Sequence, residues 1–505
     1  MENKVYYSDF GAKGDGVTND FYAMKAAHAY ANETGACVFG TAGAKYYISK
    51  TAGESIFVKT CTDFCGAEII IDDSDVKPED PERLNSIFII KSENEPIIYE
   101  RNSAPVKILS AFCPIDINTK NIPFAPGYPA MIIPYDEDTK VYRRLGATSN
   151  DGADQHELII IDKYGVIDPK TPALLPYKNV TKLIVHRIDD APIVFENVKI
   201  TTIANKAPRE YTYYARNIQI RRSNTTIRNL EHYIVGEGEG GAPYSGFVFP
   251  LNVNNILVEN CVLSGHKFYK ETSGRSWMGT YDIGGGTANN ITYKNCKQVN
   301  FFKEDGTQNN TLWGIMGTNY CKNITYDSCL LSRFDAHAGI YNASIINSTV
   351  SNIRLTGGGK FTVKDSTIYG NALTSLREDY GCTWRGDVEI TNVKILNTSD
   401  TVWLLGARFY EYHNFGYQAY YPENVKVDGL TLANPAKVYV YNDITPQGDF
   451  DISAPRVVVN GEEVDNVNQM IITKSVTAKN LDETVLSLEG SLDPVLNSQL
   501  EITRE

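Results

Sequence analysis

The sequence of 505 residues has no long hydrophobic run, and no segment approaches the roughly 20 consecutive apolar residues that span a bilayer. Its first residues, MENKVYYSDFG, show neither the apolar core nor the small-residue cleavage site of a signal peptide. These absences predict no membrane partner and a cytoplasmic location, with secretion only if an export segment has been trimmed from the sequence.

Positive charge is also in short supply. There are 48 Lys and Arg residues against 61 Asp and Glu residues, which gives a net charge of −13 at pH 7. Because nucleic acid and anionic membranes are bound through basic surfaces, we expect neither as a partner. Closely spaced pairs of Cys and His ligands are lacking too, so the sequence predicts no metal site and implies no cofactor.

What the sequence does contain is a short phrase that returns several times. Its copies alternate apolar with polar residues, the period of a strand with one buried face, and they read KNITYDSCL (322–330), YNASIINSTV (341–350), KFTVKDSTIY (360–369) and DVEITNVKI (387–395). When the copies are aligned on their polar residue pairs, they are 20, 18 and 27 residues apart. A repeat this short, with one strand per unit, predicts an all-β solenoid whose strands stack as a parallel β-helix.

Two residue types recur at equivalent places of the repeat. Asn290 and Asn323 occupy turn positions, where we expect ladders of hydrogen-bonded Asn side chains rather than glycosylation. Four cysteines stand where a small apolar residue is needed, so we expect buried thiols at Cys261, Cys296, Cys321 and Cys329.

Residues 9–20 read DFGAKGDGVTND and suit a turn followed by a helix. Asp20 can cap this helix, which should end near Gly35. The strand-like runs CVFG and KYYIS follow. The segment therefore predicts a lid with one helix over the open end of the solenoid, where backbone groups would otherwise lack partners.

The motif D-F-G-A-K-G-D-G-x-T-x-D, followed by a helix and by G-A-C-V-F and K-Y-Y-I, resembles the N-terminal cap of the pectate lyase / polygalacturonase superfamily. These proteins are right-handed β-helices and include phage tailspikes, so the resemblance, over about residues 5–50, implies a right-handed solenoid. It also implies a virion location if the chain is of phage origin. Members hydrolyse, eliminate, epimerise or merely bind polysaccharide, so the motif indicates a fold rather than a reaction. The chain departs from the common pattern at Thr41-Ala42-Gly43, where Pro-x-Gly is usual.

The predicted solenoid divides the chain into four parts. They are an N-terminal cap (1–50), early coils (51–190) with an inserted β-rich subdomain at about 92–180, the main β-helix with an active groove (191–434), and a C-terminal β cap or small domain (435–505).

Charged residues precede the repeated phrases at near-constant offsets. Asp282, Asp335 and Asp379 lie 13, 12 and 13 residues before the polar pair of their phrase, and Arg354 lies 11 before its own. Equivalent positions of a solenoid share a face, so these residues are predicted to form one stripe, to which His337 adds an imidazole. Crowding of like charges should raise the pKa of one carboxyl.

Two carboxyls of this stripe could serve as acid and base. Two strand spacings separate Asp335 from the Glu378-Asp379 pair, which places their backbones about 9.6 Å apart. Inverting glycosidases hold their carboxyls about 6.5–9.5 Å apart, so the spacing favours inversion. The predicted catalytic residues are Asp335, Asp379, Glu378, His337 and Asp282.

Aromatic residues and arginines near the stripe could stack on sugar faces and bind hydroxyls or carboxylates. Gly265-His266-Lys267 is similar to a short Gly-His element of polygalacturonases, but the N-T-D and R-I-K phrases of that family are absent. Its catalytic residues are therefore not carried over. The predicted substrate-binding residues are Arg333, Arg354, Arg377, Trp384, Tyr380, Trp313, Trp277 and His266.

These residues predict a glycoside hydrolase that cleaves a polysaccharide or oligosaccharide, with Asp335 and either Asp379 or Glu378 as acid and base and His337 tuning Asp335. Two alternatives stay open. One is a polysaccharide lyase that acts on a uronate polymer with arginine and histidine. The other is a tailspike-like homotrimer that binds a surface glycan. For any single residue, a surface ion pair or simple packing is the competing interpretation.

Overall fold

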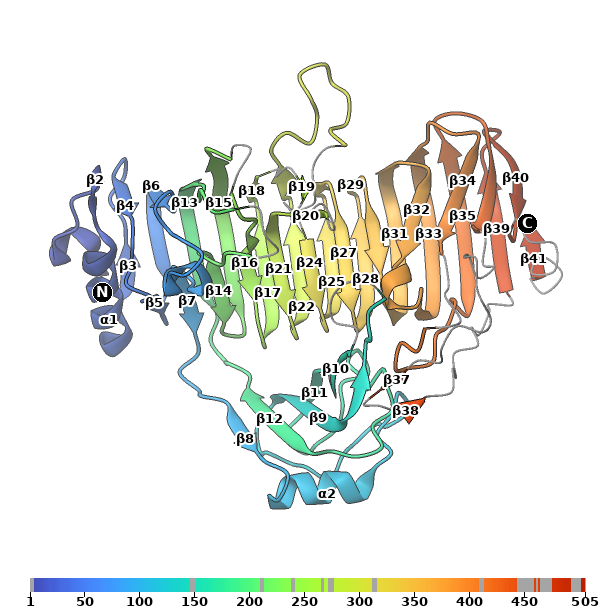
Figure 1. Cartoon of the computed structure of the whole chain (residues 1–505), viewed down its shortest axis with the longest axis horizontal. Coiled ribbons are helices and arrows are strands. Elements are labelled where there is room, and N and C mark those ends of the chain that lie inside the picture. The colour runs from blue at the N-terminus through green and yellow to red at the C-terminus, as the bar shows by residue number, and fades with distance from the viewer. Residues whose placement is uncertain are drawn as a thin grey trace. The chain divides into compact units, whose positions relative to one another are not determined.

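The computed structural model shows an all-β chain dominated by parallel strands, with helices α1 (Phe21–Thr34) and α2 (Ala104–Phe112) (Figure 1). It describes residues 4–145, 151–208, 213–237, 241–264, 268–270, 277–310, 316–407, 413–442, 458–459, 462–463, 475–491 and 501–504. The chain forms two compact units. The first contains Met1–Glu95, Ile188–Gly317 and Asp327–Phe334, and the second contains Pro96–Arg187, Thr318–Tyr326 and Asp335–Glu505.

The first unit begins with a short segment that contains helix α1, one 3-10 helix and four short strands. This helix ends at Gly35, whose left-handed conformation (φ 72°) confirms the predicted C-terminus. Asp20 precedes the helix, but its side chain does not cap it, because its carboxylate accepts backbone N–H bonds from Lys13 (2.6 Å) and Gly14 (3.0 Å). Asp20 is therefore the N-cap residue by position, as predicted, but its side chain orders the glycine-rich turn rather than the first turn of the helix. The other elements are β1 (Lys4–Tyr6), η1 (Tyr7–Phe10), β2 (Asp15–Asn19), β3 (Cys37–Phe39) and β4 (Lys45–Ile48).

Parallel pairing organises the rest of the first unit. Its elements are β5 (Ile56–Val58), β6 (Thr62–Asp72), η2 (Pro81–Leu84), β7 (Phe88–Lys91), β13 (Ile193–Ile203), β14 (Ile218–Arg221), β15 (Thr225–Val235), β16 (Ser245–Pro250), β17 (Asn254–Glu259), β18 (Val262–Leu263), β19 (Phe268–Lys270), β20 (Trp277–Gly279), β21 (Tyr281–Gly286), β22 (Asn289–Lys294) and β23 (Lys297–Gln298). One series pairs in the order β6, β13, β15, β17, β22, and a second in the order β5, β7, β14, β16, β21, each strand parallel to the next. Buried and outward residues alternate along these strands, as in β15.

An inserted subdomain in the second unit is antiparallel. Besides α2 it contains β8 (Ile97–Tyr99), β9 (Ala130–Val141), β10 (Ala153–His156), β11 (Ile159–Ile161) and β12 (Lys182–Arg187). Strand β9 pairs antiparallel with β10, β11 and β12, and β12 pairs with β8. Val106 and Leu109 of α2 share one hydrophobic cluster with strand residues such as Ile132. The sequence predicted a β-rich insert at about 92–180 but not its helix.

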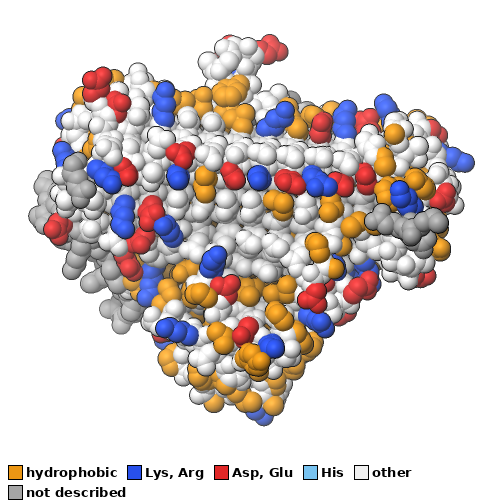
Figure 2. Space-filling model, turned by 180° about the vertical axis from the view of Figure 1, so that it is seen from behind, with side chains coloured by type: hydrophobic (Ala, Val, Ile, Leu, Met, Phe, Trp, Pro, Cys, Tyr) orange, Lys and Arg blue, Asp and Glu red, His pale blue; other side chains and the backbone are white. Residues whose placement is uncertain are grey.

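Hydrophobic side chains are exposed on the insert, and Figure 2 shows them gathered around its tip. They include Ile98, Ile108 and Tyr164, which are 52%, 49% and 68% exposed. None of the helices in the described part of the chain is long and apolar enough to cross a membrane.

The remaining strands of the second unit again pair in parallel. Around the points where the chain passes between the units lie β24 (Met316–Asn319), β25 (Lys322–Asp327), β26 (Leu330–Leu331) and β27 (Phe334–Ala338). Beyond them come β28 (Ile340–Ile346), β29 (Thr349–Val350), β30 (Ile353–Leu355), β31 (Gly357–Tyr369), β32 (Ala372–Leu376), η3 (Glu378–Tyr380), β33 (Trp384–Leu396), β34 (Thr401–Gly406), β35 (Asn424–Leu432), β36 (Ala436–Tyr441), β37 (Val458–Val459), β38 (Glu462–Glu463), β39 (Ser475–Leu481), β40 (Val485–Glu489) and β41 (Glu501–Arg504).

These strands form two parallel series, and Figure 1 shows the successive strands of a series next to one another. One runs β28, β31, β33, β35, β39, β41, and the other runs β30, β32, β34, β36, β40. Parallel pairing therefore continues to Arg504, where the sequence predicted a separate C-terminal region. The repeat was hard to see there because the strands are far apart in the sequence: Asn424 of β35 pairs with Ser475 of β39.

Asn side chains form ladders at the turns, as predicted. In the first unit Asn290 donates to Asn255 (3.1 Å) and Asn255 donates to Asn224 (2.5 Å), and in the second Asn342 donates to Asn323 (2.8 Å). All five have φ between 51° and 63°, a left-handed conformation that Asn tolerates better than most residues. The predicted buried thiols are also confirmed, at Cys261, Cys296, Cys321 and Cys329.

A buried ion pair ties the insert to the parallel strands within the second unit. Lys322 Nζ donates to Glu157 Oε2 at 2.7 Å and to the Pro172 carbonyl at 2.5 Å. Glu157 also accepts the backbone N–H bonds of Leu174 and Leu175. Burial lowers the pKa of Lys322, and the charge of Glu157 offsets part of this effect. The insert is therefore anchored by charges that satisfy one another away from water.

His28 should make the stability of the protein depend on pH. Its ring is fully buried in α1, with Nε2 2.8 Å from the Tyr7 hydroxyl, and burial lowers its pKa to about 3. Unfolding restores a pKa of about 6.5, so the unfolded chain binds an extra proton between these values and stability falls as the pH drops below about 6.5. We expect this group to lower the free energy of unfolding by about 2 kcal/mol from pH 7 to pH 5.

Urea unfolding at the two pH values measures the effect. The matched variant His28→Gln keeps a hydrogen-bonding side chain that does not titrate, so its stability should fall less over the same interval, by about 2 kcal/mol. Equal losses in the wild type and the variant would contradict the assignment.

Candidate functional site

A chain of charged side chains links three elements of the second unit. Asp335 lies on β27, Arg377 directly follows β32, and Asp379 lies in the turn η3. Arg377 Nη1 donates to Asp335 Oδ1 at 2.8 Å, while its Nε and Nη2 donate to the two oxygens of Asp379 at 3.0 and 2.6 Å. One guanidinium therefore binds both carboxylates and occupies the space between them.

A second guanidinium reaches the cluster from the insert. Arg144 Nε donates to Asp379 Oδ2 at 2.8 Å, and the backbone N–H of Leu145 donates to the Asp379 carbonyl at 2.9 Å. Burial raises the pKa of Asp379, but the charges of Arg377 and Arg144 outweigh it and hold the pKa below its usual range. Burial likewise lowers the pKa of Arg377, whereas Asp335 and Asp379 raise it to a net value above its ordinary one. Asp379 is thus a fixed anion.

The imidazole of His337 is a partly exposed end of this chain of charges. Its Nε2 lies 3.3 Å from Asp335 Oδ2, and its side chain is 21% exposed, whereas Asp335 is fully buried. A buried carboxylate at this distance can pair with the imidazole ring when the ring is protonated. The order of contacts is Asp379, Arg377, Asp335, His337. The sequence predicted that His337 would tune Asp335, and the structure places the two side chains 3.3 Å apart, with Asp335 as the buried member of the pair.

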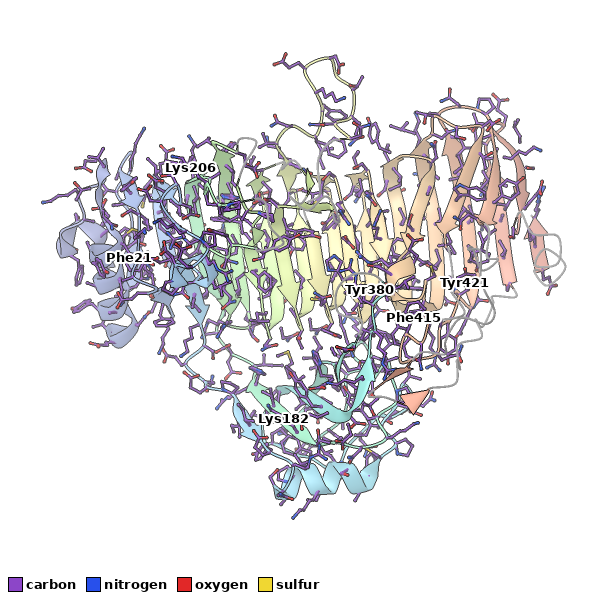
Figure 3. All side chains as sticks on the ribbon, in the orientation of Figure 1. Phe21, Lys182, Lys206, Tyr380, Phe415 and Tyr421 are labelled. Atoms are coloured by element: carbon purple, nitrogen blue, oxygen red, sulfur yellow. The ribbon has the colours of Figure 1, made fainter. Side chains whose placement is uncertain are left out.

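Tyr380, the last residue of η3, supports both guanidinium groups. The centre of its ring lies 5.4 Å from Arg377 and 5.8 Å from Arg144. Figure 3 shows Tyr380 near Phe415. Gly381 ends the turn in a left-handed conformation (φ 80°), and a side chain there would meet the Phe415 ring at 2.9 Å. The close packing of this turn therefore requires glycine.

Further tyrosines pack around Ala338, next to His337 in the sequence. Tyr142 from the insert and Tyr417 lie with ring centres 4.8 Å apart, and the Tyr417 hydroxyl donates to the Tyr380 carbonyl. The aromatic cluster is formed by Tyr142, Tyr320, Tyr380 and Tyr417 around Ala338. Burial raises the pKa of each of these hydroxyls, so they stay neutral at physiological pH.

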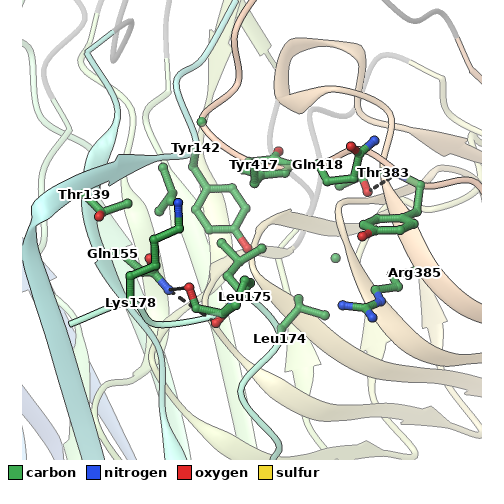
Figure 4. A pocket seen from close by; sticks show the side chains of 15 residues that line it. Thr139, Tyr142, Gln155, Leu174, Leu175, Lys178, Thr383, Arg385, Tyr417 and Gln418 are labelled. Carbon is green, nitrogen blue, oxygen red and sulfur yellow. Dashed lines mark hydrogen bonds between the residues drawn. The ribbon is translucent and has the colours of Figure 1, made fainter. Parts of the chain in front are cut away.

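A pocket of about 290 Å³ lies in the second unit between the insert and the parallel strands (Figure 4). The insert contributes residues between Thr139 and Lys178, the strands contribute Gly357 and Arg385, and the segment 416–420 completes the wall. Tyr142 and Tyr417 line this pocket and also belong to the aromatic cluster, so the pocket adjoins the charged residues.

The structure brings together Asp335, His337, Arg377, Glu378, Asp379 and Tyr380. It does not leave a water-sized gap between Asp335 and Asp379, because Arg377 bridges them. Asp379 also lacks the raised pKa that the sequence predicted for one member of the set. Glu378, by contrast, is exposed on η3. Among the described residues, no group of three or more His, Cys, Asp or Glu side chains is placed to hold a metal ion.

Asp282, for which the sequence predicted a catalytic role, lies on β21. It is fully buried in the first unit, where one oxygen lies 2.6 Å from His232 Nδ1 and the other accepts the backbone N–H of Ser264. His232 itself is buried and stacks on Phe247 with ring centres 3.5 Å apart.

Three of the predicted substrate-binding residues are not part of the chain of charged side chains described above. Trp384 is fully buried, packs on Phe361 and donates to the Asp387 carbonyl, so the prediction that it stacks on a sugar is wrong. Arg333 is buried in the first unit, and Arg354 is exposed on β30. Outside the described residues lie Trp313, His266 and the side chain of Trp277.

Sequence reasoning missed the residues that the insert supplies. Arg144 is 235 positions from its partner Asp379, so no local pattern joins them. The available signal was the run VYRR (141–144), which places a tyrosine and two arginines directly after a strand. Tyr417 and Arg385 were likewise not proposed as site residues.

No protein-family model and no curated protein sequence matches this chain. The fold is similar to that of the tailspike of Pseudomonas phage phi297, with a TM-score of 0.51 and 11% identity over 95% of this chain and 81% of that one. Weaker likenesses are the Streptococcus pneumoniae surface adhesin PfbA (TM-score 0.43, 10% identity, 97% and 99% covered) and the A-module of an Azotobacter vinelandii mannuronan C-5 epimerase (0.39, 11%, 100% and 97%). The predicted resemblance to right-handed parallel β-helix proteins is confirmed.

Replacing Arg377 should destabilise the second unit. Arg377→Met leaves Asp335 buried without its guanidinium partner, and we expect the free energy of unfolding to fall by about 3–5 kcal/mol. Urea unfolding at neutral pH measures this loss.

The matched control is Arg101→Met in the insert, which breaks an ion pair with Asp138 whose side chains are 51% and 56% exposed. Its loss should stay below about 1 kcal/mol. The double variant Asp335→Asn/Arg377→Met removes the buried charge together with its partner and should recover part of the loss. A double variant as unstable as Arg377→Met would show that the buried charge is not the cause.

Proposed function

We propose that the protein is a carbohydrate-active enzyme that cleaves a polysaccharide at the Asp335–His337 pair, on a scaffold wound as a right-handed solenoid. The observation that carries the proposal is a partly exposed imidazole that lies 3.3 Å from a buried carboxylate, which Arg377 binds in turn at 2.8 Å. The ligand class is supported by the resemblance of the N-terminal cap to a superfamily whose members act on or bind polysaccharides.

Proton transfer is the chemistry that these residues can perform. His337 takes or gives a proton at the ring nitrogen that does not face Asp335, and Asp335 stabilises the imidazolium that forms. Arg377 holds Asp335 in position, while Asp379 and Arg144 hold Arg377. The residues behind the imidazole are therefore positioning residues.

Hydrolysis is the first candidate reaction. His337 gives a proton to the glycosidic oxygen as the bond from C1 to that oxygen breaks, and a carboxylate takes a proton from the water that attacks C1. Glu378 suits the second role because it is the exposed carboxyl of η3, whereas Asp379 is bound by two guanidinium groups.

Elimination is the second candidate, and the bridge from Arg377 to both aspartates favours it. Asp379 is bound by two guanidinium groups, so His337 is the one clear group of the set left for proton transfer. A single proton-transfer group suffices for β-elimination. His337 would take the C5 proton of a uronate, the bond from C4 to the glycosidic oxygen would break, and a double bond would form between C4 and C5. The released oxygen takes up a proton, and the unsaturated product absorbs in the near ultraviolet.

A panel of neutral and uronate-containing polysaccharides tests the proposal. Reducing ends report any cleavage, and near-ultraviolet absorbance separates elimination from hydrolysis. On the substrate that is cleaved, His337→Gln should lower kcat/KM by about 10²- to 10⁴-fold because it removes the acid–base group. Asp335→Asn should lower it too and shift the pH profile, because it alters the partner that orients the imidazole.

A variant of Glu378 distinguishes hydrolysis from elimination. Glu378→Gln should abolish hydrolysis but leave elimination nearly unchanged. Its control is Glu389→Gln, which removes a partly exposed carboxylate that pairs with Lys360. Full activity in His337→Gln would refute the site. Binding of a polysaccharide without any cleavage would refute the enzymatic proposal in favour of a glycan-binding protein.

A further inference from the structure

The pocket beside the aromatic cluster has a lining that the proposed acid–base chemistry does not use. Its volume of about 290 Å³ is near the lower end of the roughly 300–1,000 Å³ that is common for small-molecule sites. It can therefore enclose a small group such as a single sugar ring, and not a long oligosaccharide.

The charged groups of the pocket are both cations. Lys178 and Arg385 line it, and no Asp or Glu does. Figure 4 places these two side chains on opposite sides of the pocket, with Tyr142 between them in this view. Among the residues that the structure describes, neither cation forms an ion pair with a carboxylate, in contrast to Arg377 and Arg144 nearby. The pocket therefore offers positive charge to a ligand.

The Arg385 guanidinium has a defined support. It lies over the ring of Tyr420, 5.0 Å from its centre, and is partly exposed. Stacking on a ring leaves the edge of the planar guanidinium available for two parallel hydrogen bonds, the geometry that matches a carboxylate. A lysine ammonium on the far side adds a second, more adaptable charge.

The remaining wall provides groups that suit a sugar. Tyr142, Tyr417 and Tyr420 offer aromatic surface on which the CH face of a pyranose can pack. Gln155 is held in place because its amide Nε2 donates to the Leu175 and Pro176 carbonyls, at 3.3 and 3.2 Å. Its amide group is therefore a preorganised partner for a sugar hydroxyl.

We propose that this pocket binds the carboxylate-bearing ring of an acidic sugar, a hexuronate, with Arg385 pairing with the carboxylate and Lys178 adding positive charge from the opposite side of the pocket. This inference rests on the proposed function, because it assumes that the ligand is a glycan, and it names the substrate class as a uronate-containing polysaccharide. Tyr142 and Tyr417 connect the pocket to Tyr380 and so to the charged cluster, which makes the pocket a subsite next to the site of cleavage.

Isothermal titration calorimetry with the full chain tests the subsite. The ligands are oligogalacturonate and oligoglucuronate, a neutral gluco-oligosaccharide of equal length, and a sulfated neutral oligosaccharide. We expect at least one of the uronate ligands to bind and the neutral one to bind weakly or not at all. Arg385→Gln and Lys178→Gln should each weaken uronate binding by about 10- to 100-fold, and Arg385→Lys should fall between Arg385→Gln and the wild type.

Lys163→Gln provides the matched control. Lys163 is an exposed lysine of the insert that lies over Tyr164 and does not line the pocket, so its variant changes the net charge equally and should bind as the wild type does. Thermal melting of each variant shows whether the fold is retained. If Arg385→Gln does not fold, the test depends on Lys178→Gln. Lys178 is exposed, so we expect this variant to fold.

Several results would overturn the subsite. Equal binding of neutral and uronate ligands, or unchanged binding in folded Lys178→Gln and Arg385→Gln, would do so. Equal or tighter binding of the sulfated ligand would refute the preference for a carboxylate. The proposed function fails on a different result. If a uronate ligand binds but is never cleaved, the subsite is supported and the enzymatic proposal is refuted. If a neutral polysaccharide is cleaved and no uronate ligand binds, the enzymatic proposal is supported and the subsite is refuted.

Discussion

Parallel strand pairing is the constraint on which the rest of the structure depends. Neighbouring strands must lie about 4.8 Å apart and keep their register, so each pass of the chain within a unit has to place an inward residue over the inward residue before it. Asn residues at the turns meet this demand twice, since they adopt left-handed conformations and their side chains hydrogen-bond to the next Asn. The connections between strands are free of the constraint. They vary in length, and they carry the insert and the turn η3.

In the second unit, the connections between strands bring together charged side chains that are far from one another in the sequence. The insert is anchored through the buried pair Lys322–Glu157, and from this anchored position it supplies Arg144 to Asp379. Buried charges are costly unless they are paired and hydrogen-bonded, and here each one has several partners. Such pairing holds the side chains in defined orientations, which is what a site for oriented proton transfer requires.

The arrangement also assigns different tasks to similar residues. Asp379 is neutralised by two guanidinium groups, Asp335 is buried behind His337, and Glu378 is open to solvent. Three carboxyls that look equivalent in the sequence therefore have different surroundings, and in the proposed mechanism they serve as a structural anion, a positioning group and a base. The pocket on the other side of the aromatic cluster is positively charged instead. Lys178 and Arg385 line it, and neither has a carboxylate partner among the described residues. A glycan that carries carboxylates would find complementary charge there and a proton-transfer group beside it.

The amino-acid sequence by itself determined the repeat, the strand positions, the Asn ladders, the buried thiols and the helix that ends at Gly35, because each depends on local periodicity or on the conformational preference of one residue. It also located Asp335, His337, Arg377 and Tyr380, since unusual residues interrupt the repeat there. The burial of Asp282 and Trp384, the bridge of Arg377 between two aspartates, the arrival of Arg144 and the existence of the pocket were decided only by the tertiary structure. Each of these depends on which face of a strand a residue occupies, or on contacts between segments far apart in the sequence, from 42 positions for Arg377 and Asp335 to 235 for Arg144 and Asp379. No local pattern encodes such contacts.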